Sequence, residues 1–331
     1  MKKIRKSVLL MVLLLLCLAI GGCKKKVGTP EDNPIQEEKE EVDDVDIVIG
    51  FSAIDMGNPF YTTLEHSIRE EAKRKGYPMI TKDSQGSQEL QNQHIHEMIE
   101  EGINILILTP VDREGITPSL KELKDAKVKV INVDSKVKET KYIEAFIGSD
   151  NEKAGQVCAE EMIARIPEGG KVVILENQAQ SAVIDRITSF EESLSGAEKG
   201  FEIVERRDTK GQKDLAASAI LEILGNNKDV DAIMCGNDQI AFAVQHAVKS
   251  LNQDTVMIFS VDGSPEIKQE LEKPDSNMVA TVAQTPISIG KTAFDTLEAI
   301  ADGKEFEEEI LEPVYLVTKE NLEAYGIDGW K

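Results

Sequence analysis

The sequence predicts an α/β protein with two doubly wound lobes, each built on a parallel sheet. From residue 46 onward, short β-branched apolar runs alternate with longer segments of helical period. This alternation favours parallel sheets with right-handed crossovers and helices on both faces. About a dozen strands are expected, which is more than one open sheet comfortably holds. Two lobes are therefore the natural arrangement.

The elements follow in order along the chain. Asn58 is placed to cap the first helix, and Pro59 fills its first position, where a missing N–H costs nothing. Helices are expected at Pro59–Lys75, Glu89–Glu101, Asn151–Ile166, Leu215–Leu224 and Ala241–Leu251. Strands are expected at Ile47–Phe51, Met79–Thr81, Ile105–Leu108, Val128–Val133, Lys171–Leu175, Ile203–Glu205, Ala232–Cys235, Met257–Val261 and Val279–Ala283.

The N-terminus is typical of an export signal. A basic head precedes the apolar run Val8–Ile20, and two glycines and Cys23 follow it. A membrane span needs about 20 apolar residues, so this run is too short to be one. Ile20–Cys23 resembles the lipobox of bacterial lipoproteins, which implies a signal peptide over residues 1–22 and an acylated Cys23. The alternative is an ordinary secretory signal with a chance cysteine. Residues 23–45 are acidic with few apolar side chains, so we expect a flexible linker there.

The charge of the chain excludes nucleic acid as a partner. The sequence has 38 basic and 60 acidic residues, and the signal holds four of the basic ones and no acid, so the mature chain has a formal net charge of −26. Such a surface repels nucleic acid and anionic lipid head groups, so contact with the membrane is expected through the anchor alone. Cys158 and Cys235 lie in apolar surroundings without metal or redox spacing, which favours buried free thiols over a disulfide.

Polar residues follow most of the predicted strands. Ligands of doubly wound proteins bind beyond the carboxyl ends of the strands, so these residues are candidate contacts. A carboxylate accepts hydroxyl protons, an amide offers both a donor and an acceptor, and an aromatic ring covers the apolar face of a sugar. The segments are Ser52 with Asn58–Tyr61, Asp83–Gln85, Thr109–Asp112, Asp134 and Ser135 with Gly148–Asn151, Gly236–Asp238, Val261–Gly263 and Ala283–Pro286.

From about residue 46 to residue 329, this series resembles the type I periplasmic binding proteins of the ribose- and galactose-binding kind. The segments that carry the resemblance include NPFY, DSQ, TPVD, GSDN, GND, SVDG and VAQTP. It implies two lobes joined by a hinge of three crossings, near Ser149, Gln284 and Pro313. The N-terminal lobe would comprise residues 46–149 and 285–313, and the C-terminal lobe residues 150–284 and 314–331.

The resemblance also implies a binding site. Phe60 and Tyr61 would stack on or flank a sugar ring, and Asp134 would accept its hydroxyl protons. The remaining contacts would come from Asn58, Arg186, Asn237, Asp262 and Gln284.

Four departures from the ribose-type pattern leave the ligand open. In the ribose-type pattern an arginine follows the first aspartate and an aromatic residue precedes the second, whereas this chain has Ser135 and Val261 at those positions. Thr109 replaces an asparagine of the pattern, and the aromatic residue expected around Lys210 is missing. Ribose therefore does not follow from the resemblance. A different pentose, a hexose or a cyclic polyol is possible.

Some of these residues have structural alternatives. Asp134, Asn237 and Asp262 could be helix caps, and Arg186 could be a surface helix residue. Asp238 is the better candidate for a pure cap, opening the next helix. For Asp83, Asp112 and Asp150 we expect structural turn roles.

The sequence has no motif of a nucleotide-binding or catalytic site, and His94 and His96 lie two apart on a probable helix, which is a poor metal pair. We therefore expect a binding protein without cofactor or metal rather than an enzyme. The function implied is extracytoplasmic capture of a monosaccharide or related polyol by a monomeric lipoprotein, anchored to the cell membrane, for delivery to an ABC transporter permease. The alternatives are delivery to a sensor histidine kinase or chemoreceptor, and nucleoside binding. A repressor of the same fold is rejected, because a signal and an acidic spacer occupy the place of its DNA-binding unit.

Overall fold

The computed structural model describes residues 47–198, 200–226 and 229–330. The predicted signal peptide, the acylated Cys23 and the acidic linker over residues 23–45 lie outside these ranges. Within them, no helix combines the length and the apolar composition that crossing a membrane requires.

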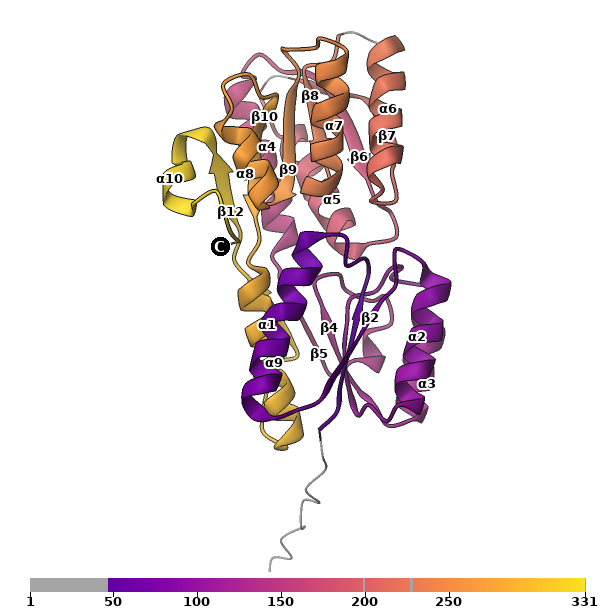
Figure 1. The fold of residues 1–331 in the computed structure, drawn as a ribbon. Coiled ribbons are helices and arrows are strands. Elements are labelled where there is room, and N and C mark those ends of the chain that lie inside the picture. The colour runs from indigo at the N-terminus through magenta and orange to yellow at the C-terminus, as the bar shows by residue number, and fades with distance from the viewer. Residues whose placement is uncertain (1–46, 199, 227–228, 331) are drawn as a thin grey trace, which may run out of the picture. The chain divides into compact units, whose positions relative to one another are not determined.

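The first lobe is built on a six-stranded sheet in the order β11-β5-β4-β3-β1-β2, and every pair in it is parallel. Helices cover both faces (Figure 1). α1 and α9 bury Leu64 and Phe294 against one face, and α2 and α3 bury Met98 and Leu120 against the other. The elements are β1 (Ile49–Ala53), α1 (Pro59–Lys75), β2 (Met79–Asp83), α2 (Gln88–Glu100), β3 (Ile105–Leu108), α3 (Thr117–Asp125), β4 (Lys129–Val133), β5 (Ala145–Ser149), α9 (Pro286–Ala301) and β11 (Glu309–Glu312).

The second lobe repeats the plan with the strand order β12-β10-β9-β8-β6-β7. Its strands are parallel except for β12, which runs antiparallel to β10 at the edge. Apolar side chains of α4 and α5 form one core cluster, and those of α6, α7 and α8 form another. The elements are α4 (Asn151–Arg165), β6 (Gly170–Glu176), α5 (Ser181–Ser195), β7 (Phe201–Asp208), α6 (Lys213–Asn226), β8 (Ala232–Cys235), α7 (Asp238–Ser250), β9 (Met257–Asp262), α8 (Pro265–Glu272), β10 (Met278–Ala283), β12 (Tyr315–Thr318) and α10 (Leu322–Tyr325).

The chain passes between the two sheets at three places. It leaves the first sheet after β5 and enters α4, returns from β10 into α9, and crosses again from β11 to β12. The returning helix is held on α1 by a hydrogen bond from the Ser67 hydroxyl to the Ile287 carbonyl oxygen at 2.8 Å. Every strand connection that crosses between lobes therefore passes one narrow region, which lets each lobe keep its own core.

The predicted α/β class and two-lobe sheet arrangement are confirmed. The first helix matches its prediction at both ends, and the Asn58 side chain accepts the Phe60 N–H at 2.9 Å as its cap. Three strands have no counterpart among the predicted runs: β5, β11 and β12. β11 has the sequence EILE and lies at a sheet edge with alternating exposure, so it lacks the continuous apolar run that marks a buried parallel strand.

The two thiols behave as expected. Cys158 and Cys235 are free and buried, and the Cys158 thiol donates to the Ser260 carbonyl oxygen at 3.3 Å. Burial raises the pKa of both thiols, which keeps them protonated and unreactive.

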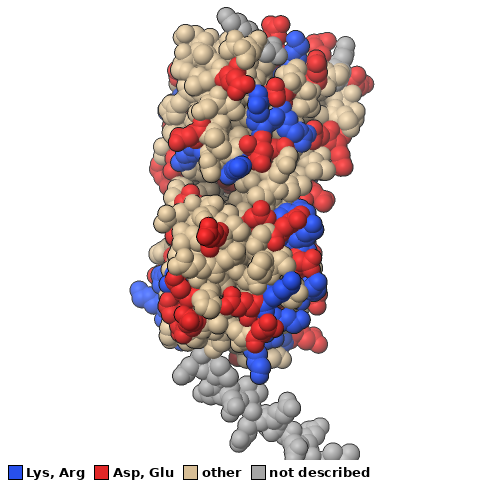
Figure 2. Space-filling model, turned by 90° about the vertical axis from the view of Figure 1, so that its right-hand side faces the viewer, with Lys and Arg blue, Asp and Glu red and all other residues tan. Residues whose placement is uncertain are grey.

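Charged side chains are spread over the surface of both lobes. On the face in Figure 2, Asp and Glu are interspersed with Lys and Arg. The exposed ion pairs of the described residues include Lys129 with Glu144 at 2.9 Å. Pairs of this kind contribute little stability individually. Their distribution agrees with the expected solvated acidic surface.

Close packing between α4 and α5 depends on Gly155. A Cβ at this position would overlap the Arg186 carbonyl oxygen and the Ser189 hydroxyl. We expect Gly155→Ala to lower the free energy of unfolding by about 1–3 kcal/mol through overpacking, measured by urea unfolding. Gly225 in α6 has open space at its Cβ position, so Gly225→Ala is the matched control. This change should raise the free energy of unfolding by about 0.5–1 kcal/mol. Equal effects of the two changes would contradict the packing argument.

Candidate functional site

Side chains from both lobes surround one cavity. Its lining contains all eight residues proposed from the sequence, together with three others: Asn58, Phe60, Tyr61, Asp134, Gln180, Ala182, Val183, Arg186, Asn237, Asp262 and Gln284. The room left at its centre is about 10 Å³, which is about the space of one water molecule. The two lobes thus hold these groups close together, and a ring can enter only if the lobes move apart.

The first lobe contributes an acid and two aromatic rings. Asp134 follows β4, is 5% exposed, and accepts a hydrogen bond from the Tyr61 hydroxyl at 3.1 Å. Burial raises the pKa of Asp134 to about 6, against the opposing effects of Arg186 and the Tyr61 hydroxyl. Burial also raises the pKa of Tyr61, so its hydroxyl stays a donor. Phe60 meets Tyr61 edge to face, with ring centroids 5.3 Å apart.

Phe60 is also held from the end of the chain. The Trp330 ring lies edge to face with Phe60 at a centroid distance of 5.7 Å. Phe60 is almost fully buried, so its ring is a fixed wall of the cavity rather than a mobile surface group.

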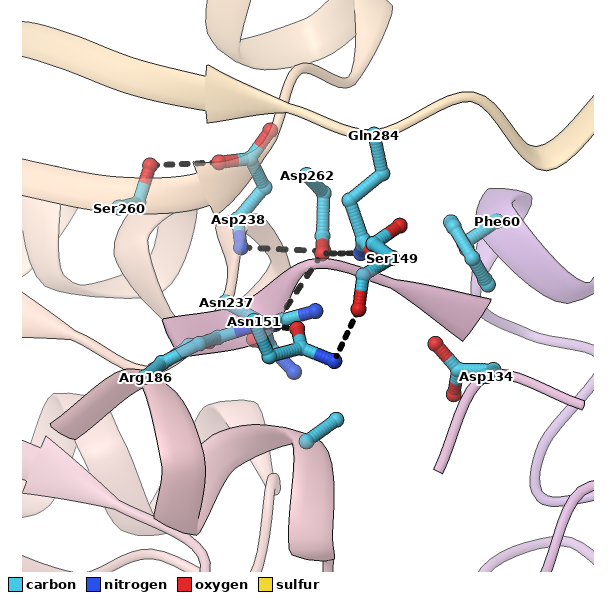
Figure 3. A network of polar contacts seen from close by, with 12 residues as sticks. Phe60, Asp134, Ser149, Asn151, Arg186, Asn237, Asp238, Ser260, Asp262 and Gln284 are labelled. Carbon is cyan, nitrogen blue, oxygen red and sulfur yellow. Dashed lines mark hydrogen bonds and ion pairs between the residues drawn. The ribbon is translucent and has the colours of Figure 1, made fainter. Parts of the chain in front are cut away.

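The second lobe contributes a buried guanidinium, that of Arg186 on α5. Its Nε donates to the Asn151 Oδ1 at 2.7 Å, and one terminal nitrogen donates to the Gly236 carbonyl oxygen at 2.9 Å. The same nitrogen lies 3.5 Å from the Asp262 Oδ1, and the Gln284 side chain donates to that oxygen at 2.7 Å (Figure 3). Arg186 is 2% exposed, so the alternative that it is a surface helix residue is wrong.

Asp262 closes this network at the end of β9. Its Oδ2 accepts the Asp238 N–H at 3.3 Å. Burial raises the pKa of Asp262, the nearby Arg186 opposes that rise, and Asp134 adds to it. Asp134 and Asp262 both have positive φ, of 65° and 143°. Such a conformation is uncommon for a non-glycine residue and often marks a functional site.

The cap role expected of Asp238 falls to Asn237, which also lines the cavity. The cap of α7 is Asn237, whose side chain accepts a backbone N–H of that helix at 3.0 Å. Asp238, expected as the cap, is buried instead and accepts hydrogen bonds from the Thr281 hydroxyl at 2.8 Å, the Ser264 N–H at 2.7 Å and the Ser260 hydroxyl. Capping occupies the Asn237 Oδ1, which leaves its amide nitrogen as the group that can donate into the cavity.

Asp83, Asp112 and Asp150 have the structural roles expected of them. Asp83 accepts the Met56 and Gln85 N–H groups, each at 3.0 Å. Asp112 accepts two N–H groups of its own turn, and Asp150 caps α4. None of the three lines the cavity.

Sequence reasoning missed Gln180, Ala182 and Val183. These residues follow β6 in the chain and line the cavity from the start of α5. Gln180 is a polar residue that follows the predicted strand Lys171–Leu175, and this is the signal that marks the candidate contacts after other strands. Among the described residues, no cluster of His, Cys, Asp and Glu could hold a metal ion.

Comparison with known families agrees with this geometry. A family model described as a periplasmic binding protein domain matches residues 49–305. The chain belongs to this family. Its fold is that of the type I members. Family members bind a solute rather than convert it, in keeping with the prediction that this chain is not an enzyme.

Two curated relatives are sugar-binding proteins. A ribose import binding protein of Bacillus subtilis is 26% identical over 275 residues, spanning 83% of this chain and 88% of the relative. The D-allose-binding periplasmic protein of Escherichia coli is 26% identical over 266 residues, spanning 75% of this chain and 83% of the relative.

Two solved structures superimpose closely. An ABC transporter solute binding protein of Mycobacterium smegmatis with bound glycerol has a TM-score of 0.80 and 28% identity, covering 86% of this chain and 99% of that one. The binding protein of an arabinose ABC transporter from Shewanella, bound to L-arabinofuranose, has a TM-score of 0.77 and 25% identity, covering 84% and 93%.

The buried carboxyl of Asp134 makes the stability of this binding protein pH-dependent. Its native pKa of about 6 exceeds the value of about 3.9 in an unfolded chain. Between these values the native state binds more protons, so the free energy of unfolding falls as the pH rises. We expect the difference in free energy of unfolding between ligand-free Asp134→Asn and the wild type to shift in favour of the variant by about 1–1.5 kcal/mol from pH 5 to pH 8. Urea unfolding at both pH values measures this difference.

The control for this comparison is Asp254→Asn, which changes an exposed carboxyl and should follow the wild type at both pH values. A difference between Asp134→Asn and the wild type that is the same at pH 5 and pH 8 would contradict the raised pKa.

Proposed function

We propose that this protein captures a monosaccharide or a related polyol outside the cell and delivers it to the permease of an ABC transporter. The observation that carries the proposal is the cavity itself. Two carboxylates, one guanidinium, several amides and two aromatic rings converge on it from both lobes. That set matches a ligand with many hydroxyl groups and an apolar ring face.

The network determines which group each side chain offers the ligand. Arg186 is largely occupied within the protein, with three partners at 2.7, 2.9 and 3.5 Å. Asp134 keeps acceptor capacity, because its one side-chain hydrogen bond in the structure comes from Tyr61. Among the described residues, the buried Oε1 of Gln284 has no partner. The site thus offers acceptors at Asp134 and Gln284 beside the amide donor of Asn237, a mixed set that suits hydroxyl groups, which both donate and accept.

The capture mechanism is closure of the lobes. Direct hydrogen bonds already join them, from the Arg113 N–H to the Ala179 carbonyl oxygen at 2.9 Å and from the Ser181 hydroxyl to the Lys136 carbonyl oxygen at 2.6 Å. A ligand bound between the lobes contacts both sets of residues only when the lobes close around it, so binding favours closure. That bound state is wider than this structure, whose cavity has room for about one water molecule. The closed surface is then the form that a permease can distinguish.

The relatives support a small polyhydroxylated ligand without fixing its identity. They are named for ribose, allose and arabinose, and one solved structure holds glycerol. The departures at Ser135, Val261 and Thr109 remove groups on which the ribose-type pattern depends. A thermal-shift screen of pentoses, hexoses, inositols and nucleosides would identify the ligand, because saturation at 100 times the dissociation constant adds about 2.7 kcal/mol of stability.

The proposal includes a lipid anchor at Cys23 and action as a monomer at the outer side of the cell membrane. The alternative role, in which the protein presents its ligand to a sensor kinase or chemoreceptor, uses the same closed form. Neighbouring genes separate the two roles, since permease and ATPase genes favour transport and a histidine kinase gene favours sensing.

The two cavity carboxylates should dominate affinity. Asp134→Ala and Asp262→Ala each leave ligand hydroxyls without an acceptor in a dry site, at a cost of about 1.5–3 kcal/mol. Calorimetry with the sugar identified by the screen should show affinity lower by about tenfold or more. Asp254→Ala, at an exposed turn, should bind like the wild type. Unchanged affinity in both cavity variants would rule out this site.

The anchor is tested on the full-length chain. Cys23→Ala removes the thiol that would carry the lipid, and we expect the protein to move from the membrane fraction to the medium or periplasm. A diacyl group holds a protein firmly, whereas a single chain is marginal. Cys158→Ala changes a buried thiol and should stay with the membrane. Retention of the Cys23 variant would overturn the lipoprotein assignment.

A further inference from the structure

A second, larger space adjoins the central cavity at the mouth between the lobes. This mouth groove has a volume of about 520 Å³, against about 10 Å³ for the cavity. Four residues line both: Asn58, Tyr61, Gln180 and Asn237. The loop after β1 forms one wall of the groove, and the segment from Lys210 to Asp214 with the start of α7 forms the other. The space next to the site therefore shares part of its lining and contacts both lobes.

The lining of the mouth groove suits hydroxyl groups. Six of its side chains are amides: Asn58, Gln85, Gln180, Gln212, Asn237 and Gln239. Its charges balance, since Asp55 and Asp214 face it together with Lys210 and Lys213. A balanced lining gives no preference for a phosphate or another strongly charged group. Tyr61 is its aromatic residue and is 7% exposed, so no open ring face is offered to a nucleobase.

One buried atom of a groove residue has no partner among the described residues. Gln239 is 8% exposed, and its side-chain Oε1 makes no hydrogen bond. Buried polar atoms are almost always paired, and leaving one unpaired costs free energy. Because Gln239 lines the groove, a turn of its side chain toward the groove would let a hydroxyl donor satisfy this oxygen.

The direct contacts that close the lobes do not seal the groove. Those contacts join Arg113 and Lys136 to the segment of Ala179 and Ser181. Among the described residues, no hydrogen bond connects the loop 54–58 with the segment 210–214. A ligand group placed there would supply the contacts between lobes that the protein itself does not make.

We propose that the natural ligand is longer than one ring and carries a second hydroxylated unit, as in a disaccharide or a glycosylated polyol. This inference rests on the proposed function and specifies its ligand class. One unit occupies the central cavity beside Asp134 and Asp262. The cavity must widen from its present volume of about 10 Å³ as the lobes separate to admit this unit. The second unit lies in the mouth groove, donates a hydroxyl to Gln239, and meets the amides of Gln180 and Gln212.

The test is calorimetry on the whole binding protein with matched sugars. The monosaccharides are ribose, arabinose, galactose, glucose and myo-inositol, and the two-unit sugars are lactose, melibiose, maltose, cellobiose and galactinol. We expect at least one two-unit sugar to bind tenfold or more tightly than either of its components. A protein that binds a monosaccharide and no two-unit sugar would overturn this inference and leave the proposed function intact. No binding of any sugar in either set would contradict both.

Two variants locate the second unit. Gln239→Leu keeps the side-chain size and removes the unpaired oxygen, and Gln212→Ala changes an exposed residue of the groove, where folding is not at risk. Each variant should lower the affinity for the two-unit sugar by about fivefold and leave the affinity for its cavity-bound component unchanged. The unchanged affinity also shows that the variant is folded. Asp254→Ala is the control. Equal loss for both sugars, or no loss for either, would place the second unit elsewhere and overturn the assignment.

Discussion

The buried guanidinium of Arg186 is the constraint on which the site depends. A charge out of water is costly unless it is paired and hydrogen-bonded. Arg186 meets that condition with one carboxylate, Asp262, and two neutral oxygens, those of Asn151 and Gly236. Asn151 stands just after the first crossing between the lobes, and Gln284, which also binds Asp262, stands at the second. The same interaction therefore pairs the buried cation with Asp262 and ties together two of the segments that cross between the lobes.

Around this cation the protein buries three carboxyl groups: Asp134, Asp238 and Asp262. Burial raises the pKa of each, so each costs stability when it ionises. Asp238 offsets its cost within the protein, through hydroxyl and backbone donors. Asp134 has only the Tyr61 hydroxyl and keeps an uncommon backbone conformation. The difference marks Asp238 as structural and supports the proposed role of Asp134 as a ligand contact, held at some expense to the stability of the empty protein.

Much of the fold followed from the sequence because its signals are local. An apolar β-branched run marks a buried parallel strand wherever it lies, and Asn58 with Pro59 marks a helix start. β11 and β12 could not be found this way, since edge strands are defined by their neighbours rather than by their own composition. At the site, the family resemblance implied eight residues that line one cavity, but the cap of α7 was assigned to Asp238 in preference to Asn237. Either side chain can cap α7, and only the position of Ser260 and Thr281 on neighbouring strands draws Asp238 inward.

The replacement of arginine by Ser135 links ligand choice to closure. The Ser135 hydroxyl accepts the Ala182 N–H at 3.5 Å across the cleft, so the residue contributes to the contact between lobes and not to the charge of the site. Without a second guanidinium, the cavity holds two carboxylates, Asp134 and Asp262, against one cation. This excess of carboxylates over cations supports the proposal of an uncharged hydroxylated ligand, which can donate to the carboxylates and accept from the Asn237 amide, because an anionic solute would be repelled by the second carboxylate.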